Sequence, residues 1–288
     1  MSYLEAAILG LVQGVFMFVP VSSTAHLVIA QHLLIQGGSS LPPPESPAMI
    51  LFDLVVHVGT LVSIVYVFHR SLRQFTAATL QDTVALARQP KEWLDRRLSL
   101  RLALLGLLTV FVTGVIGLAF KSDFERVFAA PEAVAGTLAI TGALLWWTDR
   151  LSPRTRGLRD IGFGIAITMG VAQGLSLIPG LSRSGMTIIA GLFMGLKRRW
   201  AAEFSFLVAI PTILAATLVQ SIEVFRGTGM EGIGPGPLLV GFVVSAAVGI
   251  AALKLVLALL YRAKLKIFAF YLWGMAALVA FGALDGLL

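Results

Sequence analysis

Residues 6–44 read AAILGLVQGVFMFVPVSSTAHLVIAQHLLIQGGSSLPPP, and none of these 39 residues is Asp, Glu, Lys or Arg. A single straight helix of that length would overshoot a bilayer, whose apolar core is spanned by roughly 20 helical residues. Pro20 interrupts the stretch, and proline breaks a helix because it lacks an N–H donor and clashes with the preceding turn. The two pieces, 6–19 and 21–35, are each too short to cross. The stretch therefore predicts a helical hairpin that dips into the membrane and returns.

A second stretch has the same design. Residues 161–196 contain an apolar segment, then Pro179-Gly180, then another apolar segment. At an offset of 160 the identical residues are Gly10, Gln13, Gly14, Ser22, Ile29 and Ala30 with Gly170, Gln173, Gly174, Ser182, Ile189 and Ala190. The pattern predicts an inverted repeat with halves at about 1–148 and 160–288. Each half has one hairpin followed by three spans, and an odd number of spans gives the second half the opposite orientation in the membrane. Chance similarity between Gly- and Ala-rich membrane segments is the alternative.

The composition of the chain is that of an integral membrane protein. Of 288 residues, 57% are hydrophobic and 13% are charged, whereas soluble domains carry about 25% charged residues. The uncharged or nearly uncharged runs are 54–69, 102–120, 133–148, 204–222, 232–253 and 267–284. We therefore predict an all-α polytopic membrane protein, with about six transmembrane helices and two re-entrant helical hairpins in one membrane domain, 1–288. The absence of cysteine excludes disulfides and thiol nucleophiles.

The basic residues concentrate in alternate connections. Of the 22 Lys and Arg residues, 17 lie in the segments 70–101, 150–159, 197–199 and 262–266. The opposite connections hold Lys121, Arg126 and Arg226. The positive-inside rule then predicts that the basic connections are cytoplasmic and that both termini and the first hairpin open to the outside. The net charge of +7 follows from this topology, so nucleic acid is not an expected partner.

The two hairpin tips carry most of the polar chemistry within the apolar segments. The first tip reads Pro20-Val21-Ser22-Ser23-Thr24-Ala25-His26, and the second reads Pro179-Gly180-Leu181-Ser182-Arg183-Ser184-Gly185-Met186-Thr187. Each tip places hydroxyl groups at a helix start, where unpaired N–H groups and the positive dipole end attract anions. Simple helix capping by Ser22 or Ser182 is the structural alternative.

Arg183 and His26 favour a functional interpretation of the tips. An arginine inside a membrane segment is costly, and its planar fork suits phosphate oxygens. A structural ion pair with Glu203, Asp53 or Asp160 is the alternative. His26, one turn past the hydroxyl cluster, is the natural proton carrier near neutral pH. If the repeats cross, the tips meet and form a pocket for a phosphate or diphosphate head group whose apolar tail lies in lipid.

At these residues the sequence resembles the bacterial undecaprenyl-diphosphate phosphatase family of the bacitracin-resistance type, over essentially the whole chain. The segment 179–187 matches the family's PGxSRSxxT motif, the segment from Gly14 to His26 matches its N-terminal motif, and 202–211 is a third match. The resemblance implies an inner-membrane enzyme that removes one phosphate from C55 isoprenyl diphosphate on the outer face. It implies that the product is the lipid carrier for peptidoglycan and other envelope glycans. The oligomeric state stays open between a monomer and a homodimer.

The resemblance and the tip chemistry together assign roles to nine residues. Arg183 would bind the diphosphate, His26 would act as general base for water or for Ser23, or would donate to the leaving phosphate, and Gln13 would position water or the head group. The expected substrate-binding residues, which orient the phosphate oxygens, are Ser22, Thr24, Ser182, Ser184 and Thr187.

One position departs from the family pattern. The family's N-terminal motif has Glu or Gln, then three residues, then Glu, and these two positions are Gln13 and Met17 in this sequence. The carboxylate of the second position is therefore absent. In the family these acids are linked to catalysis and to a divalent cation, and a Met side chain cannot bind Mg²⁺ or Ca²⁺, which prefer oxygen ligands. We therefore expect weakened cation dependence, a substitute acid among Asp53, Glu203 and Asp160, or no hydrolysis. A polyprenyl-phosphate flippase or transporter, and a non-catalytic protein with a vestigial site, are the rival hypotheses.

Overall fold

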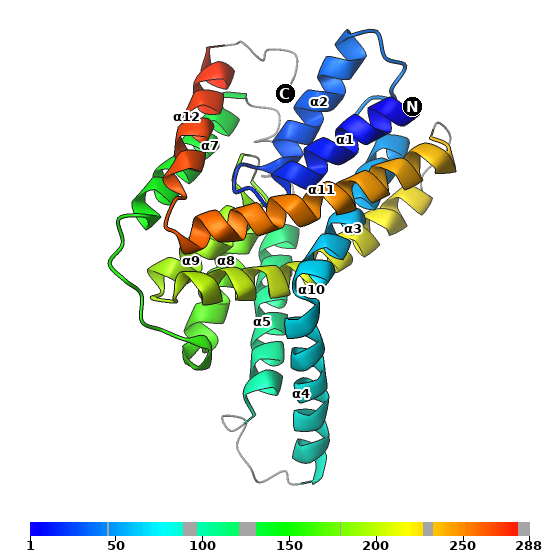
Figure 1. The fold of residues 1–288 in the computed structure, drawn as a ribbon. Helices are drawn as coiled ribbons and strands as arrows, with labels where there is room; N and C mark the ends of the chain where they lie inside the picture. Colours follow the sequence, from blue (N-terminus) through cyan, green and yellow to red (C-terminus); the bar gives the residue numbers. More distant parts are fainter. Residues whose placement is uncertain (45, 89–96, 121–130, 179, 227–232, 282–288) are drawn as a thin grey trace.

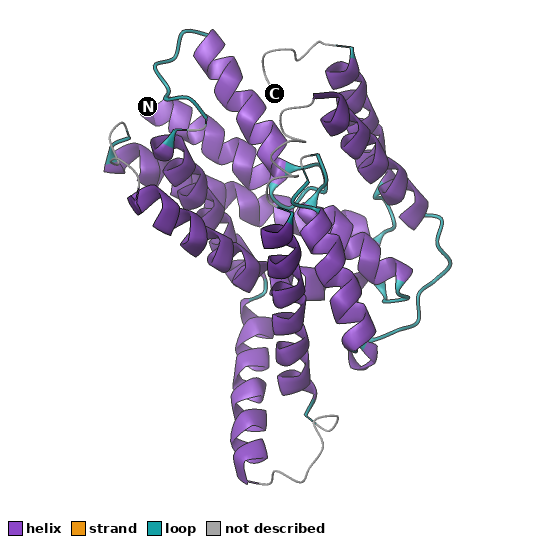
Figure 2. Cartoon of the chain, turned by 180° about the vertical axis from the view of Figure 1, so that it is seen from behind, coloured by secondary structure: helices purple, strands orange, loops and turns teal. Residues whose placement is uncertain are grey.

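The computed structural model describes residues 1–44, 46–88, 97–120, 131–178, 180–226 and 233–281, and helices dominate these parts (Figures 1 and 2). The elements are α1 (Tyr3–Phe16), α2 (Ser23–Gln36), α3 (Pro47–Val67), α4 (His69–Arg88), α5 (Leu98–Ala119), α7 (Pro131–Thr148), the short 3-10 helix η2 (Leu158–Asp160), α8 (Phe163–Leu175), α9 (Arg183–Phe193), α10 (Arg198–Arg226), α11 (Pro235–Tyr261) and α12 (Lys266–Ala280). The described residues form no β-strand, which confirms the predicted all-α class. Lys91, Arg96, Lys121, Arg126 and Pro179 lie outside the described residues.

Two helix breaks lie where the sequence predicts the hairpin tips. The first hairpin consists of α1 and α2, each of 14 residues, and the second consists of α8 with 13 residues and α9 with 11. At 1.5 Å per residue such helices extend about 20 Å or less, which is shorter than the roughly 30 Å apolar core of a bilayer. The start of α1 is defined by a capping box, in which Ser2 and Glu5 exchange side chain-to-backbone hydrogen bonds.

Within the described residues, four helices are long and apolar enough to cross a membrane by themselves: α3, α5, residues Arg198–Ile222 of α10, and α11. They overlap four of the six predicted runs. The other two, 133–148 and 267–284, correspond to the shorter apolar helices α7 and α12, which pack against each other. The described part of the chain thus agrees with a polytopic membrane protein, and four of its predicted spans reach full length within single helices.

Helix α4 was not predicted, because the basic segment 70–101 was expected only as a connection. The helix continues directly from α3, packs against α5 and projects from the helical body (Figure 1). Charged and polar residues interrupt its apolar residues along its whole length, and the apolar side chains gather on one face. A search for uniformly apolar runs therefore passes over this helix.

The helices pair across the two halves of the chain. Helix α1 of the first hairpin packs on α11, and α8 of the second hairpin packs on α5. The first span after each hairpin also meets its counterpart, since α3 packs on α10. Each hairpin therefore lies against the second span of the other half. The boundaries of the repeat halves stay a prediction.

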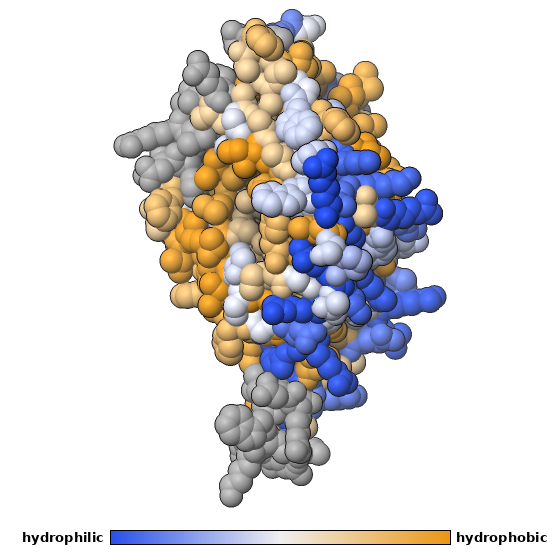
Figure 3. Space-filling view, turned by 90° about the vertical axis from the view of Figure 1, so that its left-hand side faces the viewer, coloured by the Kyte–Doolittle hydropathy of each residue, from blue (hydrophilic) through white to orange (hydrophobic). Residues whose placement is uncertain are grey.

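Exposed basic residues gather in three connections between helices. The start of α1 and the end of α12 lie at the same end of the fold (Figure 1). Exposed basic residues belong to the connections that follow α7, α9 and α11, among them Arg150, Arg156, Lys197 and Lys264. In Figure 3 hydrophilic side chains gather along one side of the face shown, and apolar side chains cover much of the remainder. The orientation that the positive-inside rule gives for the basic connections stays a prediction.

Candidate active site

The two helix breaks touch in the interior of the molecule, where their loops lie side by side in both ribbon views (Figures 1 and 2). Ser184 Oγ donates to the carbonyl oxygen of Phe18 at 3.5 Å. A Cβ atom added to Gly185 would lie 3.2 Å from the Cβ atom of Pro20. The ring of Phe18 packs edge-on against Phe206 of α10, with 6.0 Å between ring centroids. Two tips about 160 residues apart in sequence therefore form one unit.

A cavity of about 410 Å³ opens beside this contact. Its walls come from α2, α3, α5, α8, α9 and α10 and from the breaks themselves. Four of the predicted site residues line it, namely Ser22, Ser23, Thr24 and Arg183. Its volume lies in the range of small-ligand sites, and its polar groups converge on one region as such sites require.

The first tip presents the start of α2 to the cavity. Ser22 precedes the helix with φ 69° and ψ 87°, a left-handed conformation that costs energy in a residue with a side chain. Its hydroxyl makes no capping hydrogen bond, so Ser22 does not play the capping role that was the structural alternative. The first N–H groups of a helix lack intrahelical partners and lie at the positive end of its dipole. The hydroxyls of Ser22 and Ser23 and this helix start together suit an anion.

The second tip contributes Arg183, the first residue of α9. Its Nη1 atom is buried and has no hydrogen-bond partner among the described residues, and its Nη2 atom contacts only Met17 Sδ, at 3.9 Å. Asp53 lines the same cavity, but no ion pair joins it to Arg183. A buried cation without a counter-ion is unfavourable. The arrangement therefore favours an anionic ligand over the structural ion pair that the sequence left open.

The other hydroxyls of the second tip point into the protein rather than into the cavity. Ser182 caps α9 by accepting a hydrogen bond from the N–H of Gly185 at 3.2 Å. Thr187 Oγ1 bonds to Ser205 Oγ of α10 at 2.6 Å, which ties the third matching segment of the sequence to the tip. Ser182, Ser184 and Thr187 are buried and hold the tip in place. Their predicted contact with substrate stays a prediction.

His26 and Gln13 lie behind the cavity wall. A carbonyl oxygen only accepts, so His26 Nδ1 donates to the Ser22 carbonyl at 2.8 Å, and Nε2 of the neutral ring accepts from the Tyr271 hydroxyl at 2.6 Å. The imidazole also stacks on Phe16, with 4.0 Å between centroids. Gln13 Nε2 contacts Met17 Sδ at 3.5 Å, and its Oε1 atom is buried without a partner in the described chain. The catalytic roles of both residues stay predictions.

His57 and Gln31 were not predicted as part of the site, and Asp53 was expected only as one of three substitute acids. Asp53 and His57 lie one turn apart on α3, and both line the cavity. Gln31 Nε2 donates to Asp53 Oδ1 at 2.9 Å. The spacing of Asp53 and His57, four residues apart within an apolar run, is the signal that could have found them. A further missed residue, Gln173, matches Gln13 in the repeat and donates from the cavity wall to Thr113 and Thr212.

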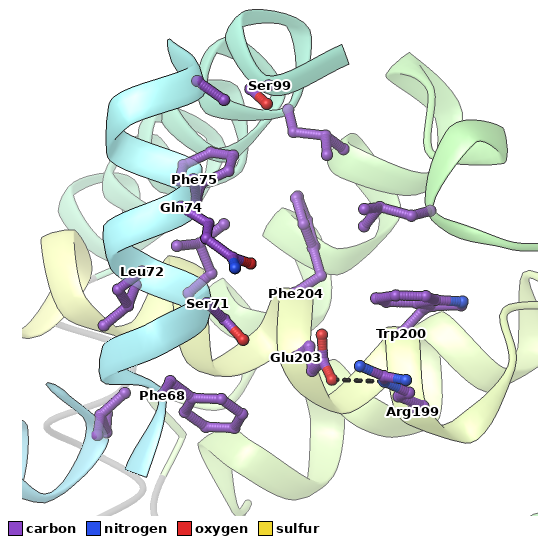
Figure 4. Close-up of a pocket in the computed structure, with 15 residues that line it drawn as sticks. Phe68, Ser71, Leu72, Gln74, Phe75, Ser99, Arg199, Trp200, Glu203 and Phe204 are labelled. Carbon is purple, nitrogen blue, oxygen red and sulfur yellow. Dashed lines mark hydrogen bonds and ion pairs between the residues drawn. The ribbon is translucent and has the colours of Figure 1, made fainter. Parts of the chain in front are cut away.

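Glu203 and Asp160, the other expected substitute acids, lie elsewhere. Glu203 lines a separate cavity of about 370 Å³, where its carboxylate accepts from Arg199 Nε at 2.7 Å (Figure 4). In that view Phe75 and Phe204 line the cavity together with Gln74, and Glu203 faces its ion-pair partner. Asp160 is exposed and accepts from the N–H of Gly157 at 2.6 Å. Neither carboxylate therefore replaces the one that is missing at Met17.

Among the described residues that line the cavity, Asp53 carries the one carboxylate that could bind a divalent cation. Mg²⁺ is commonly held by one or two carboxylates together with substrate phosphates and water, so a cation at this site stays a prediction. The described residues contain no group of three or more His, Cys, Asp or Glu side chains that could hold a metal ion. The thioether of Met17 lies between Gln13, Ser23 and Arg183, at the position where the family pattern has a carboxylate.

Comparison with known proteins agrees with the resemblance in the sequence. An undecaprenyl-diphosphatase of Halorhodospira halophila is 58% identical over 280 residues, which cover 97% of each chain. An undecaprenyl-diphosphatase of Alkalilimnicola ehrlichii is 56% identical over 286 residues, covering 97% of this chain and 96% of the relative. One from Desulfatibacillum aliphaticivorans is 38% identical over 286 residues, covering 97% of this chain and 98% of the relative. A family described as bacitracin resistance protein BacA matches residues 6–278. This chain therefore belongs to the bacitracin resistance protein BacA family.

Proposed function

We propose that this protein hydrolyses undecaprenyl diphosphate to undecaprenyl phosphate and inorganic phosphate, and thereby recycles the lipid carrier of peptidoglycan synthesis and confers bacitracin resistance. The observation that carries the proposal is Arg183, a buried guanidinium without a counter-ion that faces a cavity beside a helix start. The names of the full-length relatives supply the substrate. The cavity is large enough for a diphosphate, and the apolar helices around it suit the isoprenyl tail.

In this proposal the cavity residues bind and orient the head group. Arg183 pairs with phosphate oxygens and neutralises charge as the bond between phosphorus and the bridging oxygen breaks. The start of α2 and the hydroxyls of Ser22 and Thr24 orient the remaining oxygens. Water and the Ser23 hydroxyl are the two candidate nucleophiles at the cavity. His26 holds the turn at Ser22 through its hydrogen bond to the carbonyl there.

We place the protein in the bacterial inner membrane, with the active site open to the outer face. The support is the distribution of charge, because exposed basic residues follow α7, α9 and α11, and the positive-inside rule places such connections in the cytoplasm. The apolar helices support a multi-pass topology.

The direct test measures phosphate released from C55 diphosphate by purified protein, with and without a chelator. Arg183→Ala should lose about 10²–10³-fold in kcat, because one group that stabilises transition-state charge contributes about this much. Arg183→Lys should recover only part of the loss, because an ammonium lacks the planar fork. Arg159→Ala, an exposed arginine outside the cavity, is the matched control. Activity of Arg183→Ala at the wild-type level would contradict the proposal.

A flippase or transporter of polyprenyl phosphate is the second candidate function. The observation that favours it is the exchange of partners between the halves, with α1 on α11 and α8 on α5, which suits the repeat folds of transporters. Vesicles that contain the protein and labelled lipid separate the two activities. Movement of lipid between leaflets without phosphate release supports transport, and phosphate release without movement supports hydrolysis.

A further inference from the structure

Hydrolysis needs a group that accepts a proton from the attacking water, and neither Met17 nor the expected base His26 can serve at the cavity. Met17 has a thioether that is too weakly basic for this role. Both ring nitrogens of His26 are engaged, by the Ser22 carbonyl and by the Tyr271 hydroxyl, and the ring lies behind the wall. Of the described residues that line the cavity, Asp53 carries the only carboxylate.

The surroundings of Asp53 hold its carboxylate in one orientation. Gln31, fully buried on α2, donates from Nε2 to Oδ1 at 2.9 Å. Oδ2 has no hydrogen-bond partner among the described residues. One turn later His57, which also lines the cavity, donates from Nδ1 to the backbone carbonyl oxygen of Asp53 at 2.7 Å. Asp53 therefore presents one anchored oxygen and one oxygen that remains available to a ligand.

The position of Arg183 defines where a substrate would lie relative to this oxygen. Asp53 on α3 and Arg183 on α9 line the same cavity without an ion pair between them, and Arg183 Nη1 is buried without a partner in the described chain. Because the two residues stand on separate helices and form no ion pair, the cavity suits a phosphate bound by the arginine and a water bound by the carboxylate. His57 and Arg183 are the other ionisable side chains of the described cavity wall.

We propose that Asp53 is the catalytic base of the hydrolysis, with Gln31 as its positioning residue. Water forms a bond to the terminal phosphorus while one of its protons passes to Asp53 Oδ2. The bond from that phosphorus to the bridging oxygen breaks, and its electron pair leaves with the lipid monophosphate, whose charge Arg183 neutralises. Asp53 then returns the proton to solvent. This inference rests on the proposed function. It gives Asp53 on α3 the role of the carboxylate that is absent at position 17.

The test compares Asp53→Asn with the wild type in the C55 diphosphate assay. The substitution keeps the side-chain shape and an oxygen that can accept from Gln31, so the fold is retained. We expect kcat to fall about 10²–10⁴-fold, the usual contribution of a general base. Binding of a non-hydrolysable methylene analogue of the diphosphate should stay close to wild type or tighten, because a negative charge facing an anion is removed.

Three further measurements separate a base from a structural residue. The wild-type kcat should fall toward acid pH as Asp53 takes up a proton, and Asp53→Glu should keep part of the activity and this acid limb. Gln31→Ala should lower kcat more than it weakens analogue binding and should shift the acid limb, because Oδ1 loses its donor. Asp160→Asn, an exposed carboxylate outside the cavity, is the matched control and should match the wild type.

Each outcome decides the inference. Wild-type kcat in Asp53→Asn overturns it, and so does an unchanged acid limb in the residual activity of Asp53→Asn. Loss of analogue binding together with loss of thermal stability also overturns it, because that result indicates a structural role. Full activity in Asp53→Asn with loss in His57→Gln moves the base to His57. If the wild-type protein releases no phosphate, the proposed function is wrong. If the wild type and Asp53→Asn are both active, only the assignment of the base is wrong.

Discussion

Gly180 shows how a single residue shapes the second tip. Its φ of +84° lies in the left-handed region, and a Cβ atom there would clash with Thr137 Oγ1 and lie 2.9 Å from the carbonyl oxygen of Val134 on α7. Only glycine meets both demands. The turn that presents Arg183 to the cavity therefore requires glycine at position 180, three residues earlier.

We predict that Gly180→Ala is more destabilising than Gly38→Ala. Gly38 has a similar φ of +90°, but nothing lies within 4 Å of its added Cβ, so that variant carries only the backbone strain of about 1–2 kcal/mol. Gly180→Ala carries the same strain and a clash with α7. Thermal unfolding of the purified variants in detergent measures the difference. Equal melting temperatures would contradict the prediction, because they would show that α7 moves to accommodate the added Cβ atom without loss of stability.

At the scale of elements, small residues set how closely the hairpins lie against their neighbours. A Cβ atom added to Gly14 of α1 would lie 2.8 Å from the carbonyl oxygen of Ser245 and 2.9 Å from the Cβ atom of Val248 on α11. A Cβ atom added to Gly174, its repeat counterpart on α8, would likewise lie 2.7 Å from the Cβ atom of Ile116 on α5. Such close backbone contact is how helices associate in lipid, where the hydrophobic effect does not drive them together. The positions of the two tips follow from these two interfaces.

Gly14→Ala should therefore separate α1 from α11 and disturb the first tip. We expect a loss of about 1–3 kcal/mol, the usual cost of overpacking a well-packed interface, and a lower rate of phosphate release. Gly114→Ala on α5 is the control, because nothing lies within 4 Å of its added Cβ. Melting temperature and phosphate release, measured side by side, test the prediction. A variant at position 14 that matches the control in both would contradict it.

At the scale of the whole molecule, the distribution of basic residues orients the fold. The exposed Arg150, Arg156 and Lys264 lie in connections that alternate with those expected outside. If the basic side is cytoplasmic, the first hairpin opens outward and its tip receives substrate from the outer leaflet. The orientation therefore decides which pool of diphosphate lipid the cavity meets.

The absence of cysteine from the chain makes this orientation directly measurable. Ser40, in the connection after α2, and Ser152, in the connection after α7, are both exposed and can each be replaced by a single cysteine. A membrane-impermeant maleimide should label Ser40→Cys in intact spheroplasts and should label Ser152→Cys only after the membrane is permeabilised. The reverse pattern would invert the topology and would place the cavity on the cytoplasmic side.

Much of the fold could be predicted because its signals are local. An uncharged stretch broken by Pro20 is sufficient to predict a hairpin, and long apolar runs are sufficient to predict spans. Helix α4 could not be found in this way, because an amphipathic helix next to a span has no uniformly apolar run. The same locality explains why Arg183 stood out, since an arginine inside an apolar segment is costly whatever surrounds it.

The sequence by itself determined the class of protein, the two broken hairpins, the family and the residues most costly to place in a membrane. Only the tertiary structure decided which side chains face the cavity. It places Asp53 and His57 of α3 beside Arg183, and it turns His26 away toward Tyr271. The physical reason is that a pattern along the chain reports one helix at a time. A cavity wall is set instead by how several helices cross, which depends on close contacts between residues far apart in sequence, such as Gly14 and Ser245.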